Sequence, residues 1–524
     1  MSSDKDHSSE PAEQIGVVLV HGVGEQTRFE HLDEEIRKLV EALEALPAFQ
    51  AAQGGKVVVE IRRGWEGSFH AEQDSWHAGP FSTVCVSAKA AKQREQRFQF
   101  HEVWWADVNE RYSIAKQVRF WLWGLSVWLY PRKERSTLQG ADYVFPPEHP
   151  GGLGMYLWVR ARLLGLGAVF AVLGFSLGLI MFILKRLFEI ETPKWLQTVT
   201  NYVGGVKLYN QPRRLAPGWI PDSEDFLDTK DEPPRYSIRR RMIRALADVA
   251  LMPYDRWYVL AHSLGSVVAF NGLMETAYTW PGYLDEWQWS WLKAAHLVGP
   301  IAPGAGPIPA VTIPKRPAWC DDEIVYRTRI FRNFRGLMTY GSPLEKFATI
   351  WPARVPLARE PAFTPLAAWV NIMDPIDPVS GILKSFDQVS PACCPHPQNI
   401  GYRASPILLW SHTQYLTRKG KSHSDLPTAT MAWLLGRAGP PGSANNPLTG
   451  LSYPLHGSVF WQRAVLAWVW WIVGFVAFAA LAAIAIPIFL RLFAAGFDAS
   501  LCEVYTNTGI ELLHGFCKVA KAAK

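Results

Sequence analysis

The chain has 524 residues, of which 49% are apolar, and its formal net charge is only +6. The length predicts two or more structural units, and the small charge, without a basic stripe interleaved with aromatic residues, excludes a nucleic-acid partner. No His or Cys spacing is typical of a metal site and no loop is typical of phosphate binding, so no metal and no cofactor is expected.

The N-terminal region combines a polar tail with one apolar strand. Residues 1–14 are charged and polar, which predicts a disordered tail and no secretory signal. Residues 15–20 form a continuous apolar run, typical of a strand buried on both faces of a parallel sheet. Glycines after such a strand let backbone N–H groups approach a bound carbonyl group. This turn consists of His21, Gly22, Val23 and Gly24.

Further elements of an α/β domain follow. Helical periodicity covers residues 30–46. Strands are predicted at 57–65, 82–88 and 97–106, and the last two form a hairpin at the edge of the sheet. We therefore assign residues 15–109 to the N-terminal part of this domain.

A membrane-associated insertion is predicted at residues 110–234. The apolar stretch 163–184 has no charge and can cross a hydrocarbon layer of about 30 Å, whereas 120–130 reaches only about 16 Å as a helix. Residues 15–26 and 257–266 are expected to share one sheet, so the insertion must leave and return on one side of a membrane. A membrane hairpin or re-entrant pair is favoured; an interfacial helix and, for 120–130, a buried core helix stay open.

The helix predicted at residues 237–250 leads into the most informative motif of the chain. Its apolar residues have helical spacing, and its opposite face is expected to be solvated, with anionic lipid headgroups as the alternative contact. That face carries Arg239, Arg240, Arg241 and Arg244.

Residues 257–266 are typical of a strand, a tight serine turn and a helix. Ala261 and Gly265 lie two positions before and after Ser263, where a larger Cβ would collide as strand and helix cross. A serine in such a turn becomes a nucleophile when a histidine base and oxyanion donors are close. The predicted oxyanion donors are the N–H groups of Val23 and Leu264, and the supporting turn residues are His21, Gly22, Gly24 and Gly265.

An acid and a base follow in the order that this chemistry uses. The strand at 367–372 opens onto a turn that holds Asp374 and Asp377, each before a proline. Asp377 is the predicted acid of the triad and Asp374 the reserve. His412, expected in a loop after a short apolar strand, is the predicted base. The weaker candidates are His396, His423 and His456.

The C-terminal part predicts a membrane anchor. Residues 464–490 have no charged side chain, lie between Arg463 and Arg491, and carry tryptophans at one end, which predicts a transmembrane helix. Before it, 441–463 is a predicted linker, and 491–524 is a tail. Six scattered cysteines do not predict a disulfide framework.

These motifs together resemble the lipase/esterase branch of the α/β-hydrolase superfamily, in the style of GPI inositol-deacylase-like lipases and bacterial lipase effectors. The resemblance rests on residues 17–22, 261–265 and 340–344, on the two aspartates, and on His412. It covers roughly residues 15–65 and 235–440, the latter being the catalytic part of the domain. Two features depart from the pattern: alanine replaces the first elbow glycine, and about 200 residues separate the first turn from the elbow.

The resemblance implies an α/β-hydrolase fold, with a mostly parallel sheet flanked by helices, and a membrane-anchored serine hydrolase that cleaves carboxylic esters of lipids or acylated compounds. The expected partners are this substrate and the bilayer, and the expected location is a bacterial inner membrane with the catalytic domain in the cytoplasm. The oligomeric state is open. The alternatives are a non-catalytic membrane protein that uses a hydrolase-like scaffold to bind a partner, and a lipase effector toxin.

Overall fold

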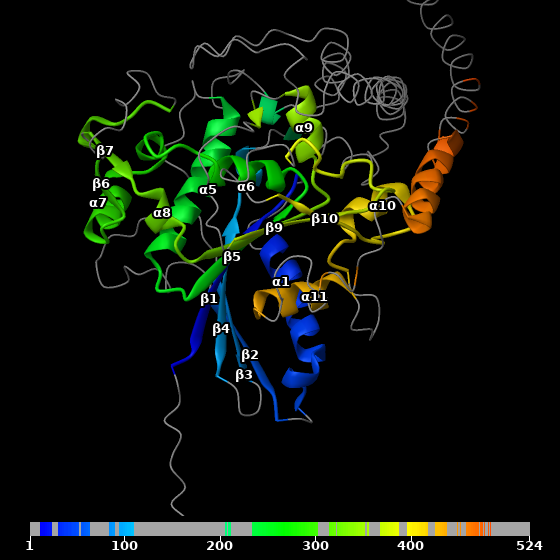
Figure 1. Ribbon diagram of the computed structural model, residues 1–524, viewed down its shortest axis with the longest axis horizontal. Coiled ribbons are helices and arrows are strands. Elements are labelled where there is room, and N and C mark those ends of the chain that lie inside the picture. Colours follow the sequence, from blue (N-terminus) through cyan, green and yellow to red (C-terminus); the bar gives the residue numbers. More distant parts are fainter. Residues whose placement is uncertain are drawn as a thin grey trace, which may run out of the picture.

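A computed structural model places one large sheet at the centre of the molecule, with helices on both of its faces (Figure 1). The structure describes residues 11–23, 30–51, 54–62, 83–89, 94–108, 205–206, 208–210, 233–301, 314–320, 322–351, 354–355, 367–386, 396–417, 425–436 and 457–470, with single positions and short runs between 448 and 483.

Within this described part, eight strands form the main sheet, in the order β10-β9-β8-β5-β1-β4-β3-β2. The strands from β10 to β4 pair in parallel, whereas β4, β3 and β2 pair antiparallel. The protein is therefore an α/β protein with a mostly parallel sheet. The strands are β1 (Glu13–Val20), β2 (Lys56–Arg62), β3 (Thr83–Lys89), β4 (Gln96–Val103), β5 (Arg256–His262), β8 (Phe334–Tyr340), β9 (Ala368–Met373) and β10 (Gln398–Gly401); β6 (Val298–Pro300) and β7 (Glu323–Val325) form a separate pair.

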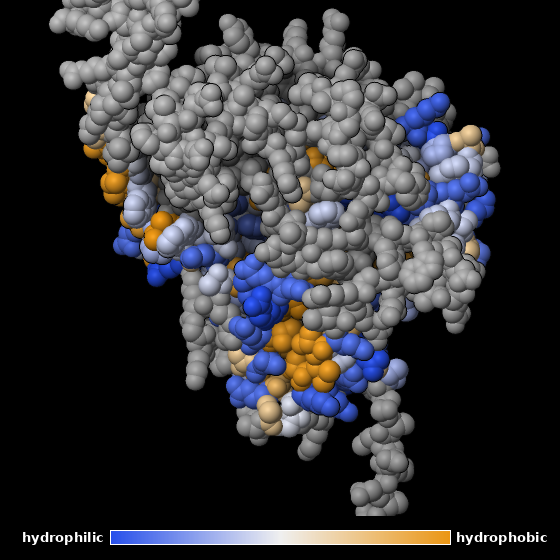
Figure 2. Space-filling model, turned by 180° about the vertical axis from the view of Figure 1, so that it is seen from behind, coloured by the Kyte–Doolittle hydropathy of each residue, from blue (hydrophilic) through white to orange (hydrophobic). Residues whose placement is uncertain are grey.

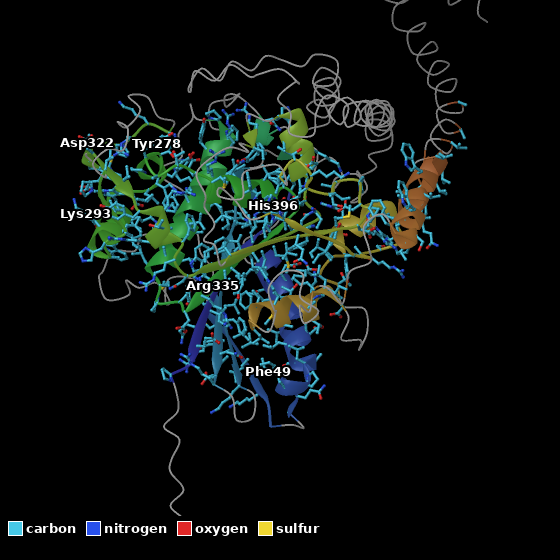
Figure 3. The ribbon with its side chains drawn as sticks, viewed as in Figure 1. Phe49, Tyr278, Lys293, Asp322, Arg335 and His396 are labelled. Carbon is cyan, nitrogen blue, oxygen red and sulfur yellow. The ribbon has the colours of Figure 1, made fainter. Side chains whose placement is uncertain are left out.

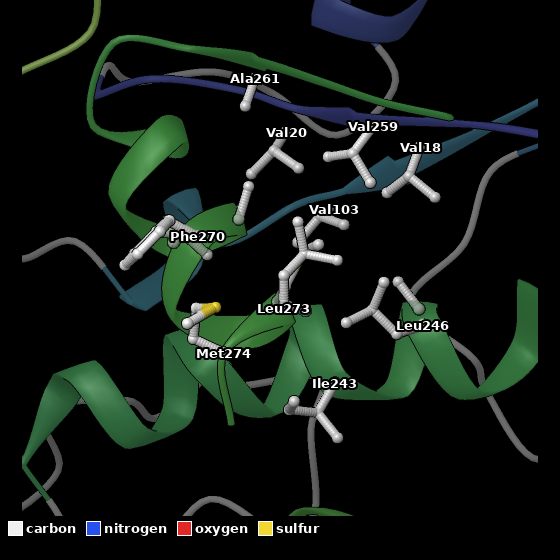
Figure 4. Close-up of a cluster of buried hydrophobic side chains, with 14 of the residues drawn as sticks. Val18, Val20, Val103, Ile243, Leu246, Val259, Ala261, Phe270, Leu273 and Met274 are labelled. Carbon is white, nitrogen blue, oxygen red and sulfur yellow. The ribbon is translucent and has the colours of Figure 1, made fainter. Parts of the chain in front are cut away.

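Two groups of helices cover the two faces. One face packs against α5 and α6, and the other against α1 and α11. The side chains of β1 alternate between these cores, since Val18 and Val20 face α5 and α6 (Figure 4) while Val17 and Leu19 face the other side. This alternation explains the continuous apolar run. The helices are α1 (Glu30–Ala45), α5 (Pro234–Leu251), α6 (Gly265–Leu273), α7 (Glu286–Ala294), α8 (Arg327–Ile330), α9 (Leu344–Ile350), α10 (Leu408–Thr413) and α11 (Leu426–Leu434).

The strand predictions for the N-terminal part are confirmed, with shifted ends. β3 and β4 form the predicted antiparallel pair, with Cys85 opposite Gln99, but the predicted place of this pair at the edge of the sheet is wrong, because β2 lies outside it. β1 begins at Glu13, so the last residues of the predicted tail 1–14 belong to the sheet.

The two parts of the predicted domain share this sheet. β1 pairs with β5 over six residues, from Ile15 opposite Arg256 to Val20 opposite Ala261. The chain leaves the sheet after β4 and, after the predicted insertion 110–234, returns to the same sheet on the other side of β1. The apolar stretches 120–130 and 163–184 lie outside the described residues.

The prediction of a solvated arginine face on α5 is wrong. At most 2% of Arg240, Arg241 and Arg244 is exposed. Arg244 Nη2 donates to the Asp285 carboxylate at 3.2 Å, and Asp285 is also the N-cap residue of α7. Later parts of the chain therefore cover this side of α5, and two of its arginines pair with buried carboxylates, Arg239 with Glu275 and Arg244 with Asp285.

The C-terminal region differs from the predicted linker, and the predicted membrane helix is described only in part. Residues 458–470 are already helical, so the helix begins inside the predicted linker 441–463. Within the described residues, no helix meets the length and hydropathy needed to cross a bilayer. Much of the predicted span 464–490, and all of the tail 491–524, lies outside those residues.

Candidate active site

Ser263 lies in a strained turn between β5 and α6. Its φ angle is +53°, in the left-handed region that non-glycine residues rarely occupy. Such strain is costly and persists only where the surrounding structure enforces it. Here the turn is held by the Ser263 N–H, which donates to the Tyr340 carbonyl at the end of β8, and by the Ser266 hydroxyl, which donates to the Ser263 carbonyl.

The turn after β1 packs directly on this serine. A Cβ at Gly265 would lie 2.4 Å from the carbonyl oxygens of Val20 and His21, and a Cβ at Gly22 would lie 2.7 Å from the Cβ of Ser263. Neither position has room for a side chain. The two glycines therefore bring the end of β1, the serine and the start of α6 into contact.

His21 fixes the conformation of this turn. Its Nδ1 donates to the Gly22 carbonyl at 2.6 Å, and its Nε2 accepts from the backbone N–H of Trp105 at 3.1 Å. The indole N–H of Trp105 donates to the His21 carbonyl, and the two rings stack with centroids 5.0 Å apart. His21 is fully buried and acts as a support of the turn.

The predicted base and acid lie next to the serine. His412 Nε2 is 2.9 Å from Ser263 Oγ, and His412 Nδ1 is 2.9 Å from Asp377 Oδ2. With a proton on Nδ1 that is donated to the Asp377 carboxylate, Nε2 is free to accept the serine proton. The structure thus brings together three side chains from distant parts of the sequence. His412 lies in the helix α10, so the prediction that it lies in a loop after a short apolar strand is wrong.

Asp377 is held as a carboxylate. Its Oδ1 accepts from the Val379 N–H at 2.8 Å, and its Oδ2 accepts from the Tyr415 hydroxyl at 2.9 Å. Burial opposes its ionisation, but the His412 charge and hydrogen bond, the Val379 N–H and the Lys346 charge outweigh it and lower the pKa of Asp377 to about 2. Asp377 is therefore ionised at neutral pH.

The reserve acid Asp374 has a different partner. Arg463 binds both of its carboxylate oxygens, with Nε at 2.9 Å from Oδ1 and Nη2 at 2.5 Å from Oδ2. The N–H groups of Ile376 and Ala404 also donate to Asp374. Asp374 is thus a structural anchor of the acidic turn, whereas Asp377 contacts the base.

The two predicted oxyanion donors, Leu264 and Val23, are chain neighbours of Ser263 and of Gly22, which packs on it. Leu264 immediately follows Ser263 and is the N-cap of α6, where the first backbone N–H groups of a helix have no acceptor within the helix. Val23 follows Gly22, which touches the serine. Gly24 lies outside the described residues. Both turns also follow the carboxyl ends of neighbouring parallel strands, β1 and β5, which is the edge where α/β proteins bind ligands.

Several residues that support the base were not identified from sequence. His262 Nε2 donates to the His412 carbonyl at 2.8 Å, and the two rings lie 4.9 Å apart. Gly341 has a φ of +62°, and a Cβ there would lie 3.2 Å from the His412 ring. The hydroxyl of Tyr415 joins the two aspartates, since it also accepts the Asp374 N–H. Of these residues, only Gly341 had a local sequence signal, because it begins the Gly-Ser-Pro sequence 341–343 that is typical of a turn.

The other candidate histidines are not part of this cluster. His396 is exposed and precedes β10, at the amino end of that strand (Figure 3). His423 and His456 lie outside the described residues. The described chain contains no group of three His, Cys, Asp or Glu side chains arranged to hold a metal ion. The two cysteines in this part of the chain, Cys85 and Cys320, are not joined to another cysteine by a disulfide.

Comparisons with protein-family models, with curated proteins and with solved structures find no match to this chain. The class of the protein therefore rests on its fold and its site: an α/β protein in which a strained serine, a histidine and a buried aspartate meet at the carboxyl edge of a mostly parallel sheet.

Proposed function

We propose that this protein is a serine hydrolase of the α/β-hydrolase fold that cleaves carboxylic esters of lipids or acylated compounds. The observation that carries the proposal is the continuous contact from Ser263 Oγ through the His412 ring to Asp377, with 2.9 Å at each step. The strained φ of Ser263 supports it, because strain of this kind is rarely retained without a functional reason.

The reaction follows from this arrangement. Ser263 Oγ attacks the ester carbonyl carbon while its proton moves to His412 Nε2. The N–H groups of Leu264 and Val23 stabilise the negative oxygen of the tetrahedral intermediate. The intermediate collapses to an acyl-serine, and the alcohol leaves with the proton from His412.

Water then completes the cycle. His412 takes a proton from a water molecule, whose oxygen attacks the acyl-serine, and the acid product leaves as the proton returns to Ser263. Asp377 remains ionised throughout and stabilises the imidazolium formed in both steps. No cofactor is needed for this chemistry.

A fluorophosphonate probe tests the proposal, because it reacts with activated serines only. The wild-type chain is expected to be labelled, and Ser263→Ala is expected to lose both the label and the hydrolysis of short acyl esters. Ser290→Ala is the matched control, since Ser290 lies on α7 and bonds only its own helix. An unlabelled wild-type chain with intact structure would instead favour the non-catalytic scaffold.

A further inference from the structure

A helix rich in exposed apolar residues lies beside α10, which carries His412 (Figure 1). We call it the tryptophan helix: residues 458–470, continued by helical positions at 472–474, 476, 480 and 483. Figure 2 shows apolar surface on this edge of the molecule, which lies at the left in that view. Its exposed residues are Trp461, Val465, Trp468, Val469, Trp470, Ile472, Val473 and Val476, each between 37% and 59% exposed.

This helix is attached to the acidic turn of the site. Arg463 projects from it to bind both oxygens of Asp374 and the Ser405 carbonyl. Further along, the indole N–H of Trp470 donates to the Pro406 carbonyl at 2.9 Å. Asp374 and Asp377 share the Tyr415 hydroxyl, so the helix and the catalytic acid belong to one hydrogen-bonded unit.

The pattern of exposure identifies the kind of partner. Up to Ala467 one side of the helix packs on the protein, but from residue 468 onward every described position is exposed. The sequence from 464 to 490 is apolar on all sides of a helix and has no charge. A groove on another protein covers one face of a helix, whereas a bilayer can surround all faces.

α10 presents apolar side chains beside this helix. Trp410 is 58% exposed and Ile407 is 36% exposed, two and five residues before His412. Tryptophan is the residue most typical of the interface between lipid headgroups and hydrocarbon. The outer side of the helix that carries the base therefore has the same character as the tryptophan helix.

We propose that the tryptophan helix enters a lipid bilayer and, through Arg463 and Asp374, holds α10 with Trp410 at the headgroup level. The substrate is then an ester of a membrane lipid that reaches Ser263 from the bilayer surface. This statement about the substrate rests on the proposed function, whereas the docking of the helix does not.

Environment-sensitive labels test the docking. The six native cysteines are replaced by serine, and an NBD fluorophore is attached at Val465→Cys or Trp410→Cys. The full chain is reconstituted in phosphatidylcholine and phosphatidylglycerol vesicles with or without doxyl-labelled lipid. Val58→Cys is the matched control, because Val58 is an equally apolar, 44% exposed residue on β2, far from α10 in the sheet order.

Labels at 465 and 410 are expected to shift to the blue and to lose most of their fluorescence with doxyl lipid, whereas the label at 58 changes in neither respect. A blue shift that is insensitive to doxyl lipid at 465 and 410 would show a protein partner or a second copy and overturn the proposal. If the cysteine-free chain does not fold, a benzophenone amino acid at the same positions gives an equivalent readout: crosslinks to lipid support docking, and crosslinks only to protein overturn it.

Fluorophosphonate labelling in the same vesicles separates the two proposals. Quenched labels with an unreactive Ser263 would retain the docking and remove the enzymatic function. A reactive Ser263 with unquenched labels would do the opposite. For the substrate, docked and reactive protein is expected to release fatty acid from vesicle phospholipid, and hydrolysis of soluble esters alone would overturn the assignment to membrane lipids.

Discussion

Single residues at the elbow set how closely β1, β5 and α6 can approach. A methyl group at Gly265 would overlap two backbone carbonyl oxygens of the β1 turn, at 2.4 Å each. Backbone atoms cannot move aside as a flexible side chain can, so the whole turn must shift. The approach of the β1 turn to Ser263 therefore depends on this position.

Gly265→Ala is therefore expected to destabilise the fold by about 1–3 kcal/mol and to abolish probe labelling of Ser263. Thermal unfolding and fluorophosphonate labelling measure the two effects. Gly474→Ala is the control, because a Cβ at Gly474 meets nothing within 4 Å. It should leave both quantities unchanged or raise stability slightly, by up to about 1 kcal/mol. A fully labelled Gly265→Ala protein would contradict the proposed geometry.

The two aspartates of the acidic turn should differ in their effects. Asp377→Asn leaves the shape of the site but allows the wrong tautomer of His412, so kcat should fall by about 10⁴-fold with little change in KM. The main effect of Asp374→Asn should be a loss of thermal stability, with a smaller fall in kcat than for Asp377→Asn. The reason is that Asp374 pairs with Arg463 and not with His412. Steady-state kinetics with a short acyl ester, corrected for folded protein, would show the reverse order if Asp374 were the acid.

At the scale of elements, one ion pair joins the tryptophan helix to the site. The carboxylate of Asp374 is fully buried and the Arg463 side chain is 13% exposed. Removing one partner of such a pair leaves a charge without compensation inside the protein. The loss is typically about 3–5 kcal/mol.

Arg463→Met should therefore lower the free energy of unfolding by roughly that amount, measured by denaturant titration in detergent or vesicles. Adding Asp374→Asn to Arg463→Met should restore part of the loss, because the buried charge is then removed. Additive effects of the two substitutions would mean that the contact contributes nothing.

Elements could be predicted from sequence where their own residues carry a local signal. The apolar run of β1 and the serine turn after β5 carry local signals, and the structure has them at the expected places. The arginines of α5 carry no such local signal, because their partners are remote in sequence. Arg239 binds Glu275 at 2.6 Å and Arg244 binds Asp285, so no local pattern could distinguish these arginines from solvated ones.

The same reason explains which parts of the site could be predicted from sequence and which could not. The order of serine, acid and base along the chain was sufficient to choose Ser263, Asp377 and His412. It could not reveal which aspartate Arg463 would bind, or that Tyr415 joins the two. The first contact depends on the position of a helix that begins almost fifty residues after α10, and the second joins residues about 40 positions apart in the sequence.

At the scale of the whole molecule, the buried His101 and the half-buried Asp248 change the stability of the fold with pH in opposite directions. Burial lowers the pKa of His101 on β4 from 6.5 to about 4. The neutral imidazole therefore contributes its full stability above pH 6.5, and this stability is lost as the pH falls towards 4. Burial, opposed by Arg244, raises the pKa of Asp248 on α5 from 3.8 to about 7. Its folded form therefore takes up a proton first, and this contribution to stability grows as the pH falls from about 7 to 4.

The pH dependences of stability from His101 and Asp248 offset each other in the wild-type chain. Substituting one group should reveal the pH dependence of the other. His101→Gln should become more stable as the pH falls from 6.5 to 4, and Asp248→Asn should become less stable over the same interval. Denaturant unfolding at half-unit pH steps measures both. Parallel curves for the two variants would show that neither group titrates as burial requires.

The position of β1 has a consequence for biosynthesis. This strand is synthesised about 240 residues before β5, one of its two neighbours in the sheet. At roughly 5–20 residues per second, the ribosome needs about 12–48 s to supply that neighbour. During this interval one edge of an apolar strand is open to wrong pairing, so we expect chaperone capture of the nascent chain to be strongest before residue 262 leaves the ribosome.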